Sequence, residues 1–249
     1  MDKVGKYEFL AEPFHCDFSQ RLFMGHLGNH LLNAADFHSD ARGFGMRDLL
    51  PMNRSWVLSR LAIEMDEMPV MYTRFTVETW VESAMRYFTN RNFRVVEKQG
   101  VEEKVLGYGR SIWAMIDTTT RQPCNLMDIR DGELMNWVEK DKVNPMSRLS
   151  RVKMSEEAEC VRTIDTGYND VDINGHINSV KYIEHVLDLW SIDWYREHRL
   201  RRFDIAYVAE CHQGDRLTFY REESDSNEYC IRICRDGNVE VVRCKVKFI

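Results

Sequence analysis

Apolar side chains recur along this chain at two different periods, one typical of helices and one typical of strands. Steps of three and four residues predict a helix from about Asn29 to Ala41, whose apolar face holds Leu31, Ala34, His38 and Ala41. The same spacing predicts a second helix over 178–191, from a stripe made of Val180, Ile183, Leu187, Trp190 and Trp194. Each helix therefore has one side to bury against a partner.

Each predicted helix is followed by segments in which apolar and polar residues alternate, as they do in half-buried strands. In the first half these segments are 56–65, 74–82, 90–97 and 105–116, and in the second half they are 203–211, 215–221, 229–235 and 239–248. Within 74–81, one predicted face holds Phe75, Val77, Thr79 and Val81, and the other holds Arg74, Thr76, Glu78 and Trp80. The dipeptide Asp236-Gly237 predicts a tight hairpin between the last two strands.

The two halves also match in the position of individual residues. Gly28-Asn29-His30 opens the first helix and Asn174-Gly175-His176 opens the second. His30 and His176 are 146 residues apart, as are Glu64 and Glu210 in the strands that follow. One offset kept across different local sequence indicates an internal duplication.

This order of elements predicts an α+β fold of two tandem domains, each an antiparallel sheet wrapped around a long central helix. We place the N-terminal domain at 1–120, a linker at 121–158 and the C-terminal domain at 159–249. The linker is polar and weakly periodic, with a short helix predicted at 133–138.

The candidate chemistry lies just ahead of the second helix, where Asp172, Asn174 and His176 alternate. A carboxylate, an amide and an imidazole beside the unpaired N–H groups of a helix start suit attack by water on a polarised carbonyl. Asn174 and Asn178 are also plausible helix caps, so spacing alone leaves a structural and a catalytic interpretation open. The first half has His26 and Gly28 at the places of Asp172 and Asn174, which favours one working site per chain.

Composition argues against several classes of protein, including those that bind nucleic acid and those that span a membrane. A net charge of −6 argues against nucleic acid as a partner, and the chain has no apolar run of membrane-spanning length. The start has no signal-peptide hydrophobic region. Seven scattered cysteines argue against a disulfide framework or a zinc site. We therefore expect a cytoplasmic protein with no metal and no cofactor.

The segment 169–183 resembles the signature of the acyl-carrier-protein (acyl-ACP) thioesterases of plants and bacteria. Further motifs of that family are matched in order by Asn29-His30-Leu31-Leu32, Trp56-Val57-Leu58-Ser59-Arg60, Val77-Glu78-Thr79-Trp80-Val81, Arg110-Ser111-Ile112-Trp113-Ala114-Met115 and Thr120-Arg121. The resemblance implies two tandem hot-dog domains, the second of them catalytic. It also implies hydrolysis of fatty acyl-ACP to free fatty acid and holo-ACP in fatty-acid biosynthesis.

The resemblance further implies a catalytic set made of Asp172, Asn174, His176 and Glu210. Departures are small, since Gly175 stands where plant members often have Gln and Ser179 where they often have Asn. An older interpretation of the family makes the next residue, Cys211, a papain-like nucleophile. Strand alternation would put Glu210 and Cys211 on opposite faces, with Cys211 on the apolar one, which favours Glu210.

The resemblance also suggests where the substrate binds. The carbonyl oxygen would lie at the start of the helix after His176, where N–H groups and the helix dipole favour negative charge. Leu31, Phe75 and Trp113 are candidates to contact the acyl chain in the first domain, and Arg199, Arg201 and Arg202 to contact the acidic carrier. The expected partner is an acyl carrier protein with a phosphopantetheine-linked acyl chain. A second copy of the chain, in a homodimer, is a further expected partner.

Three other functions fit parts of the pattern. An acyl-CoA thioesterase would use the same chemistry on another carrier. A hot-dog dehydratase or hydratase would also use His and a carboxylate, although the thioesterase match is far longer. A non-catalytic acyl-thioester-binding protein would have a broken acid–amide–His trio in both halves, whereas the second half here is intact.

Overall fold

The computed structural model describes residues 2–100, 102–149, 151–236 and 239–249, which form two compact units. Unit 1 contains the residues up to Ser59 together with Asp66–Arg148, and unit 2 contains Arg60–Met65 together with Leu149–Ile249. Most of the predicted linker thus belongs to unit 1, and six residues of one N-terminal strand belong to unit 2.

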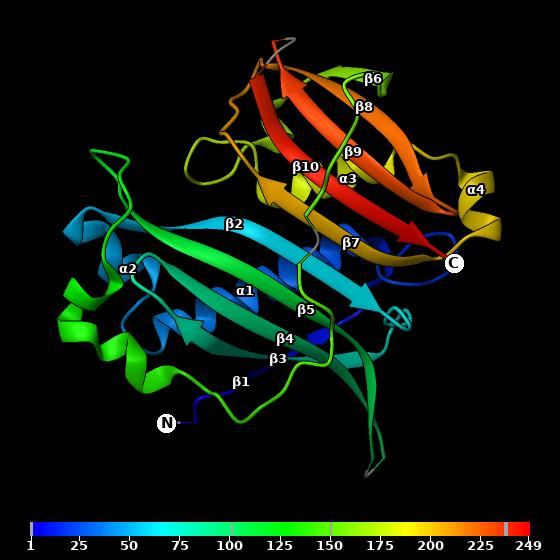
Figure 1. Cartoon of the computed structure of the whole chain (residues 1–249). Helices are drawn as coiled ribbons and strands as arrows, with labels where there is room; N and C mark the ends of the chain where they lie inside the picture. Colours follow the sequence, from blue (N-terminus) through cyan, green and yellow to red (C-terminus); the bar gives the residue numbers. More distant parts are fainter. Residues whose placement is uncertain (1, 101, 150, 237–238) are drawn as a thin grey trace. The chain divides into compact units, whose positions relative to one another are not determined.

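Unit 1 is an antiparallel sheet with one long helix, α1 (Met24–Asp40), packed against it (Figure 1). Its strand order is β1-β3-β4-β5-β2, with β1 at Gly5–Leu10, β2 at Arg54–Met65, β3 at Arg74–Ala84, β4 at Phe88–Gln99 and β5 at Glu102–Asp117. Short helical turns complete the unit: η1 (Pro13–His15), α2 (Met46–Leu49), η2 (Leu50–Met52), η3 (Leu126–Asp128) and η4 (Arg130–Trp137). The last of these confirms the short helix predicted in the linker.

Unit 2 has the same plan around a shorter helix, α3 (Ser179–Leu187). Its strand order is β7-β10-β9-β8-β6, and residues 60–64 of β2 pair antiparallel with 202–206 of β7. The bounds are β6 Glu159–Asp165, η5 Tyr168–Asp170, α4 Ile192–Glu197, β7 Leu200–Tyr207, β8 Arg216–Asp225, β9 Glu228–Arg235 and β10 Val239–Phe248. Gly237 of the predicted hairpin lies outside the described residues.

The sheet topology supports the duplication. Each unit runs through a strand, a helix and four more strands, and β6-β8-β9-β10-β7 repeats the order of β1-β3-β4-β5-β2. The predicted α+β fold of antiparallel sheets with a helix against each is therefore confirmed. The edge strands β1 and β6 were not predicted, because neither has a strong apolar alternation.

Both helix predictions differ from the structure at their ends. Helix α1 begins at Met24, ahead of the predicted Asn29, although Gly25 and Gly28 disfavour a helix. Both glycines are buried, so close packing outweighs their low propensity. The single helix over 178–191 was wrong, because α3 ends at Leu187 and α4 starts anew after the Ser191 side chain caps it.

Glu78 and Trp80, on the face of β3 opposite Phe75 and Val77, are both buried. The segment after η4 covers them. Lys142 extends its ammonium to Glu78 at 2.8 Å and lies 5.1 Å from the centre of the Trp80 ring. Asn144 donates from Nδ2 to Asn92 and to the Gly109 carbonyl. What sequence patterning marked as linker is therefore a packed layer of unit 1.

Candidate active site

The predicted trio lies on a tight loop between η5 and α3 in unit 2. Val171 and Ile177 pair as an antiparallel bridge, and the Asp172 N–H donates to the His176 carbonyl at 2.8 Å. The loop turns at Gly175, whose φ of +80° is readily accessible to glycine, and whose N–H donates to the Asp172 carbonyl at 3.0 Å. This short hairpin brings Asp172, Asn174 and His176 together.

The Asp172 carboxylate organises this loop. Its Oδ1 accepts hydrogen bonds from the N–H groups of Asn174 at 2.8 Å and His176 at 3.2 Å, and its Oδ2 lies 3.5 Å from Asn174 Nδ2. One carboxylate oxygen is thus committed to the backbone. Among the described residues, the exposed side-chain amide of Asn174 contacts only Asp172, at 3.5 Å, and it can reorient toward a ligand.

Glu210 reaches this loop from an irregular segment. The strand predicted at 203–211 was wrong at its end, because β7 stops at Tyr207. Beyond that point Glu210 Oε2 lies 3.5 Å from His176 Nε2, and Arg235 Nη1 donates to the Glu210 carbonyl at 2.9 Å. The fourth residue of the predicted set therefore lies beside the third.

Cys211 faces the interior, with 1% of its surface exposed. Its carbonyl accepts the Ile177 N–H at 2.9 Å, so the backbone of this residue supports the loop. Burial raises the pKa of the Cys211 thiol, more than the nearby Tyr182 hydroxyl lowers it. A thiol kept protonated and out of contact with solvent is poorly suited to nucleophilic attack.

The start of α3 is less open than predicted. The Asn178 side chain caps the helix by accepting the Val180 N–H at 3.0 Å, and the Asn178 carbonyl accepts the Lys181 N–H at 2.9 Å. The prediction that amides at this helix start would bind the carbonyl oxygen is therefore wrong for these two groups. The cap interpretation holds for Asn178, whereas Asn174 lies in the loop.

Two neighbours of the site were not predicted. His212 packs edge-on against the His176 ring, with 5.1 Å between the ring centres, and Arg235 holds the backbone of Glu210. His212 could have been predicted as a neighbour of the site, because it follows Glu210 by only two residues. Nothing in the sequence pattern linked Arg235 to Glu210, because the contact joins residues 25 positions apart.

The equivalent region of unit 1 is built differently. His26, Gly28 and His30 lie within helix α1, so the exposed loop has no counterpart there. The His30 ring contacts the rings of Phe9 and Phe75 at centre distances of 4.4 and 5.5 Å. Burial, together with the neighbouring His15 and His26, lowers the pKa of His30 to about 4. The residues of unit 1 at these places thus lie in a partly buried helix and differ in environment from the exposed loop of unit 2.

The residues predicted to contact an acyl chain lie in the interior of unit 1. Leu31 and Phe75 are buried, and Trp113 on β5 is half-buried with its indole N–H donating to Ser111 Oγ at 2.8 Å. Leu31 lies on α1 and Phe75 on β3, so these side chains belong to the helix–sheet core.

The three arginines predicted to contact a carrier have different environments. Arg199 is exposed, whereas Arg201 donates to Glu64 at 3.1 Å. Arg202 is buried, and its guanidinium binds both Asp204, at 2.6 Å, and Glu64, at 2.9 Å. The prediction for Arg202 was wrong in this respect: the side chain is engaged in the interior of unit 2 and is not a surface contact.

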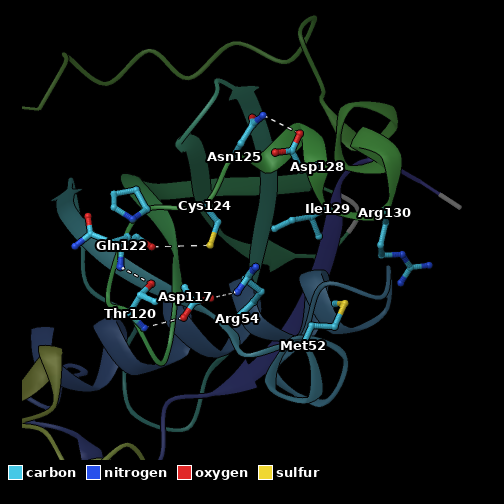
Figure 2. A pocket seen from close by; sticks show the side chains of 11 residues that line it. Met52, Arg54, Asp117, Thr120, Gln122, Cys124, Asn125, Asp128, Ile129 and Arg130 are labelled. Atoms are coloured by element: carbon cyan, nitrogen blue, oxygen red, sulfur yellow. Dashed lines mark hydrogen bonds and ion pairs between the residues drawn. The ribbon is translucent and has the colours of Figure 1, made fainter.

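A separate pocket of about 400 Å³ lies in unit 1, around the turn after β5 (Figure 2). Asp117 anchors that turn by accepting the N–H groups of Thr119 and Thr120, and it also pairs with Arg54. The lining comes from η2, β2, the 117–125 turn, the end of η3 and the start of η4, and it includes neither Leu31 nor Phe75. Its two arginines are balanced by Asp117 and Asp128, so the pocket has no strong charge preference.

Solved structures match the whole chain. An acyl-ACP thioesterase from Bacteroides thetaiotaomicron is 48% identical, with a TM-score of 0.92 over 99% of this chain and 98% of that one. The 12:0-ACP thioesterase from Umbellularia californica has the same fold, at 20% identity and a TM-score of 0.84 over 100% of this chain and 98% of that one.

Curated relatives are more distant in sequence. A chloroplastic palmitoyl-acyl carrier protein thioesterase from Gossypium hirsutum is 27% identical over 98% of this chain and 63% of that protein. The chain thus spans less than two thirds of the curated relatives it matches. The family models for the acyl-ACP thioesterase N-terminal and C-terminal domains match residues 3–131 and 153–248. The chain belongs to the acyl-ACP thioesterase family, with its hot-dog type of fold.

Proposed function

We propose that this chain hydrolyses the thioester of fatty acyl-ACP and releases free fatty acid and holo-ACP in fatty-acid biosynthesis. The observation that carries the proposal is the approach of Glu210 to His176, 3.5 Å apart, beside the loop of Asp172 and Asn174. Family membership supports this class of substrate, and the side chains at this site are of the types that the reaction needs.

The reaction uses an activated water. Glu210 takes a proton as the water oxygen attacks the thioester carbonyl carbon. The C–S bond then breaks, the acyl group leaves as the fatty acid, and the protonated His176 delivers its proton to the departing thiolate. Glu210 then passes the proton that it took from water to His176, whose Nε2 lies 3.5 Å away, which restores both groups. Imidazole suits this step because its charge changes near neutral pH. A thiolate is a good leaving group, so modest acid–base catalysis is sufficient.

The other two residues of the trio have separate tasks. Asn174 offers its side-chain amide to the developing oxyanion, a role for which one donor is typically worth about 3–4 kcal/mol. Asp172 is assigned to the loop and not to proton transfer, because its Oδ1 is occupied by two backbone N–H groups. Cys211 has no chemical role in this mechanism.

The remaining proposals concern the acyl-chain site, the carrier contacts, the cellular compartment and the oligomeric state. Unit 1 binds the acyl chain through its helix–sheet core, including Leu31, Phe75 and Trp113, and unit 2 carries out the hydrolysis. Arg199 and Arg201 lie toward the acidic carrier, the chain acts in the cytoplasm, and it forms a homodimer. Among the helices in the described part of the chain, none is long and apolar enough to cross a membrane.

The decisive experiment compares substrates and products. The purified chain should hydrolyse acyl-ACP faster than the acyl-CoA of equal chain length, and its expression in a bacterial host should raise free fatty acids. Expression of Asp172→Ala should leave them at the host level, because the loop loses the oxygen that accepts the N–H groups of Asn174 and His176. Equal rates on the two carriers would favour the acyl-CoA thioesterase. Tight binding without turnover would favour a non-catalytic acyl-thioester-binding protein.

A further inference from the structure

Asp170 makes hydrogen bonds to three separate places in unit 2. Its Oδ2 accepts the Gly167 N–H at 2.7 Å, and its Oδ1 lies 2.9 Å from His185 Nε2 on α3. Its carbonyl accepts the N–H of Asn178, the cap residue of α3, at 2.8 Å. One residue therefore ties η5, the helix face and the helix start together.

The Asp170–His185 contact is well shielded from water. The two side chains are only 14% and 18% exposed, so solvent weakens the contact little. His185 is also fixed by its place on α3 and by the Phe219 ring, whose centre lies 6.5 Å from its own. The contact therefore links the turn to the helix in a largely buried place.

The loop that carries the proposed catalytic groups lies between the two ends of this link. The hydrogen bond between the Asp170 carbonyl and the Asn178 N–H joins the first residue pair of the hairpin, and the Val171–Ile177 bridge is the second pair. Asp172 and His176 form the third pair, through the Asp172 N–H and the His176 carbonyl. A displacement of Asp170 thus moves the residue pair that places the His176 ring against Glu210.

We propose that Asp170 and His185 are positioning residues for hydrolysis, which hold the loop so that His176 and Asn174 meet the thioester. This inference rests on the proposed function. Neither residue touches the reacting atoms, and both act through the placement of His176. Misplacing a reacting group by about 1 Å costs about a hundredfold in rate, so a small shift at the base of the loop matters.

The test uses two variants of one position. His185→Leu keeps the bulk and the helix preference but removes the donor to Asp170, whereas His185→Gln keeps an N–H donor at similar reach. We expect the Leu variant to lose about tenfold or more in kcat, with KM within about threefold, and the Gln variant to keep most of its kcat. Asp188→Asn is the matched control, because it breaks an ion pair to Arg162 (3.3 Å) just beyond the same helix.

A second readout does not depend on turnover. The Cε1–Hε1 signal of the His176 ring, measured by NMR at one pH, should shift or broaden in His185→Leu and keep its wild-type form in His185→Gln and Asp188→Asn. The proposal is overturned if His185→Leu leaves both kcat per folded chain and the His176 signal as in His185→Gln. Inactive wild-type protein would refute the proposed function, and the NMR signal would still decide whether the link positions His176.

Discussion

Replacing Glu78 by Gln should destabilise unit 1 by about 3 kcal/mol at neutral pH. The Glu78 side chain is 2% exposed and meets three cations, Lys142 at 2.8 Å, Lys6 at 3.0 Å and Arg94 at 3.1 Å. Burial by itself raises the pKa of Glu78, but hydrogen bonds from these three cations outweigh it and lower the pKa to about 2.

The magnitude follows from the linkage between proton binding and folding. The pKa of Glu78 falls from 4.5 in the unfolded chain to about 2 in the folded one, and each unit is worth about 1.4 kcal/mol. Because the folded pKa is depressed, this stabilisation is full above pH 4.5 and is lost as the pH falls toward 2. The difference between wild type and Glu78→Gln should therefore shrink to about 2 kcal/mol at pH 3.5.

Urea unfolding at pH 7 and pH 3.5 measures this difference, with hydrogen–deuterium exchange of β3 to isolate unit 1. Glu103→Gln is the matched control, since Glu103 pairs with the same Arg94 at 3.3 Å but its side chain is 40% exposed. That variant should lose less than about 1 kcal/mol. A loss below about 1 kcal/mol for Glu78→Gln, or a difference that does not change with pH, would refute the reasoning.

Four further outcomes are expected. Glu210→Gln should lower kcat on acyl-ACP by about a hundredfold or more in steady-state assays, because it removes the base; a smaller change assigns that role elsewhere. Cys211→Ala should keep near-normal turnover, and abolished activity would restore the thiol nucleophile. Arg199→Ala should raise KM for acyl-ACP but not for a small acyl thioester, and an equal effect on both excludes a carrier contact. Burial lowers the pKa of His38 from 6.5 to about 3, so between pH 7.5 and 5 a proton binds the unfolded chain but not the folded one. The free energy of unfolding should therefore fall by about 2 kcal/mol over this range. In urea unfolding of His38→Asn, this part of the pH dependence should be absent.

The sequence alone determined the class of fold, because hydrophobic periodicity reports directly which side of each element is buried. It determined the duplication through the common offset of His30–His176 and Glu64–Glu210. It also brought Asp172, Asn174 and His176 into one loop, since residues two apart on a tight turn cannot separate far. These are local properties, and local sequence is enough to specify them.

Only the tertiary structure decided where elements end and what distant side chains meet. It ended β7 at Tyr207, which lets Glu210 reach His176 while Cys211 stays buried. It covered Glu78 with Lys142 from a segment that looked like a linker, and it buried Arg202 against Asp204. Burial and ion pairing depend on residues far away in the chain, so their free energies override local propensity and cannot be read from the local pattern.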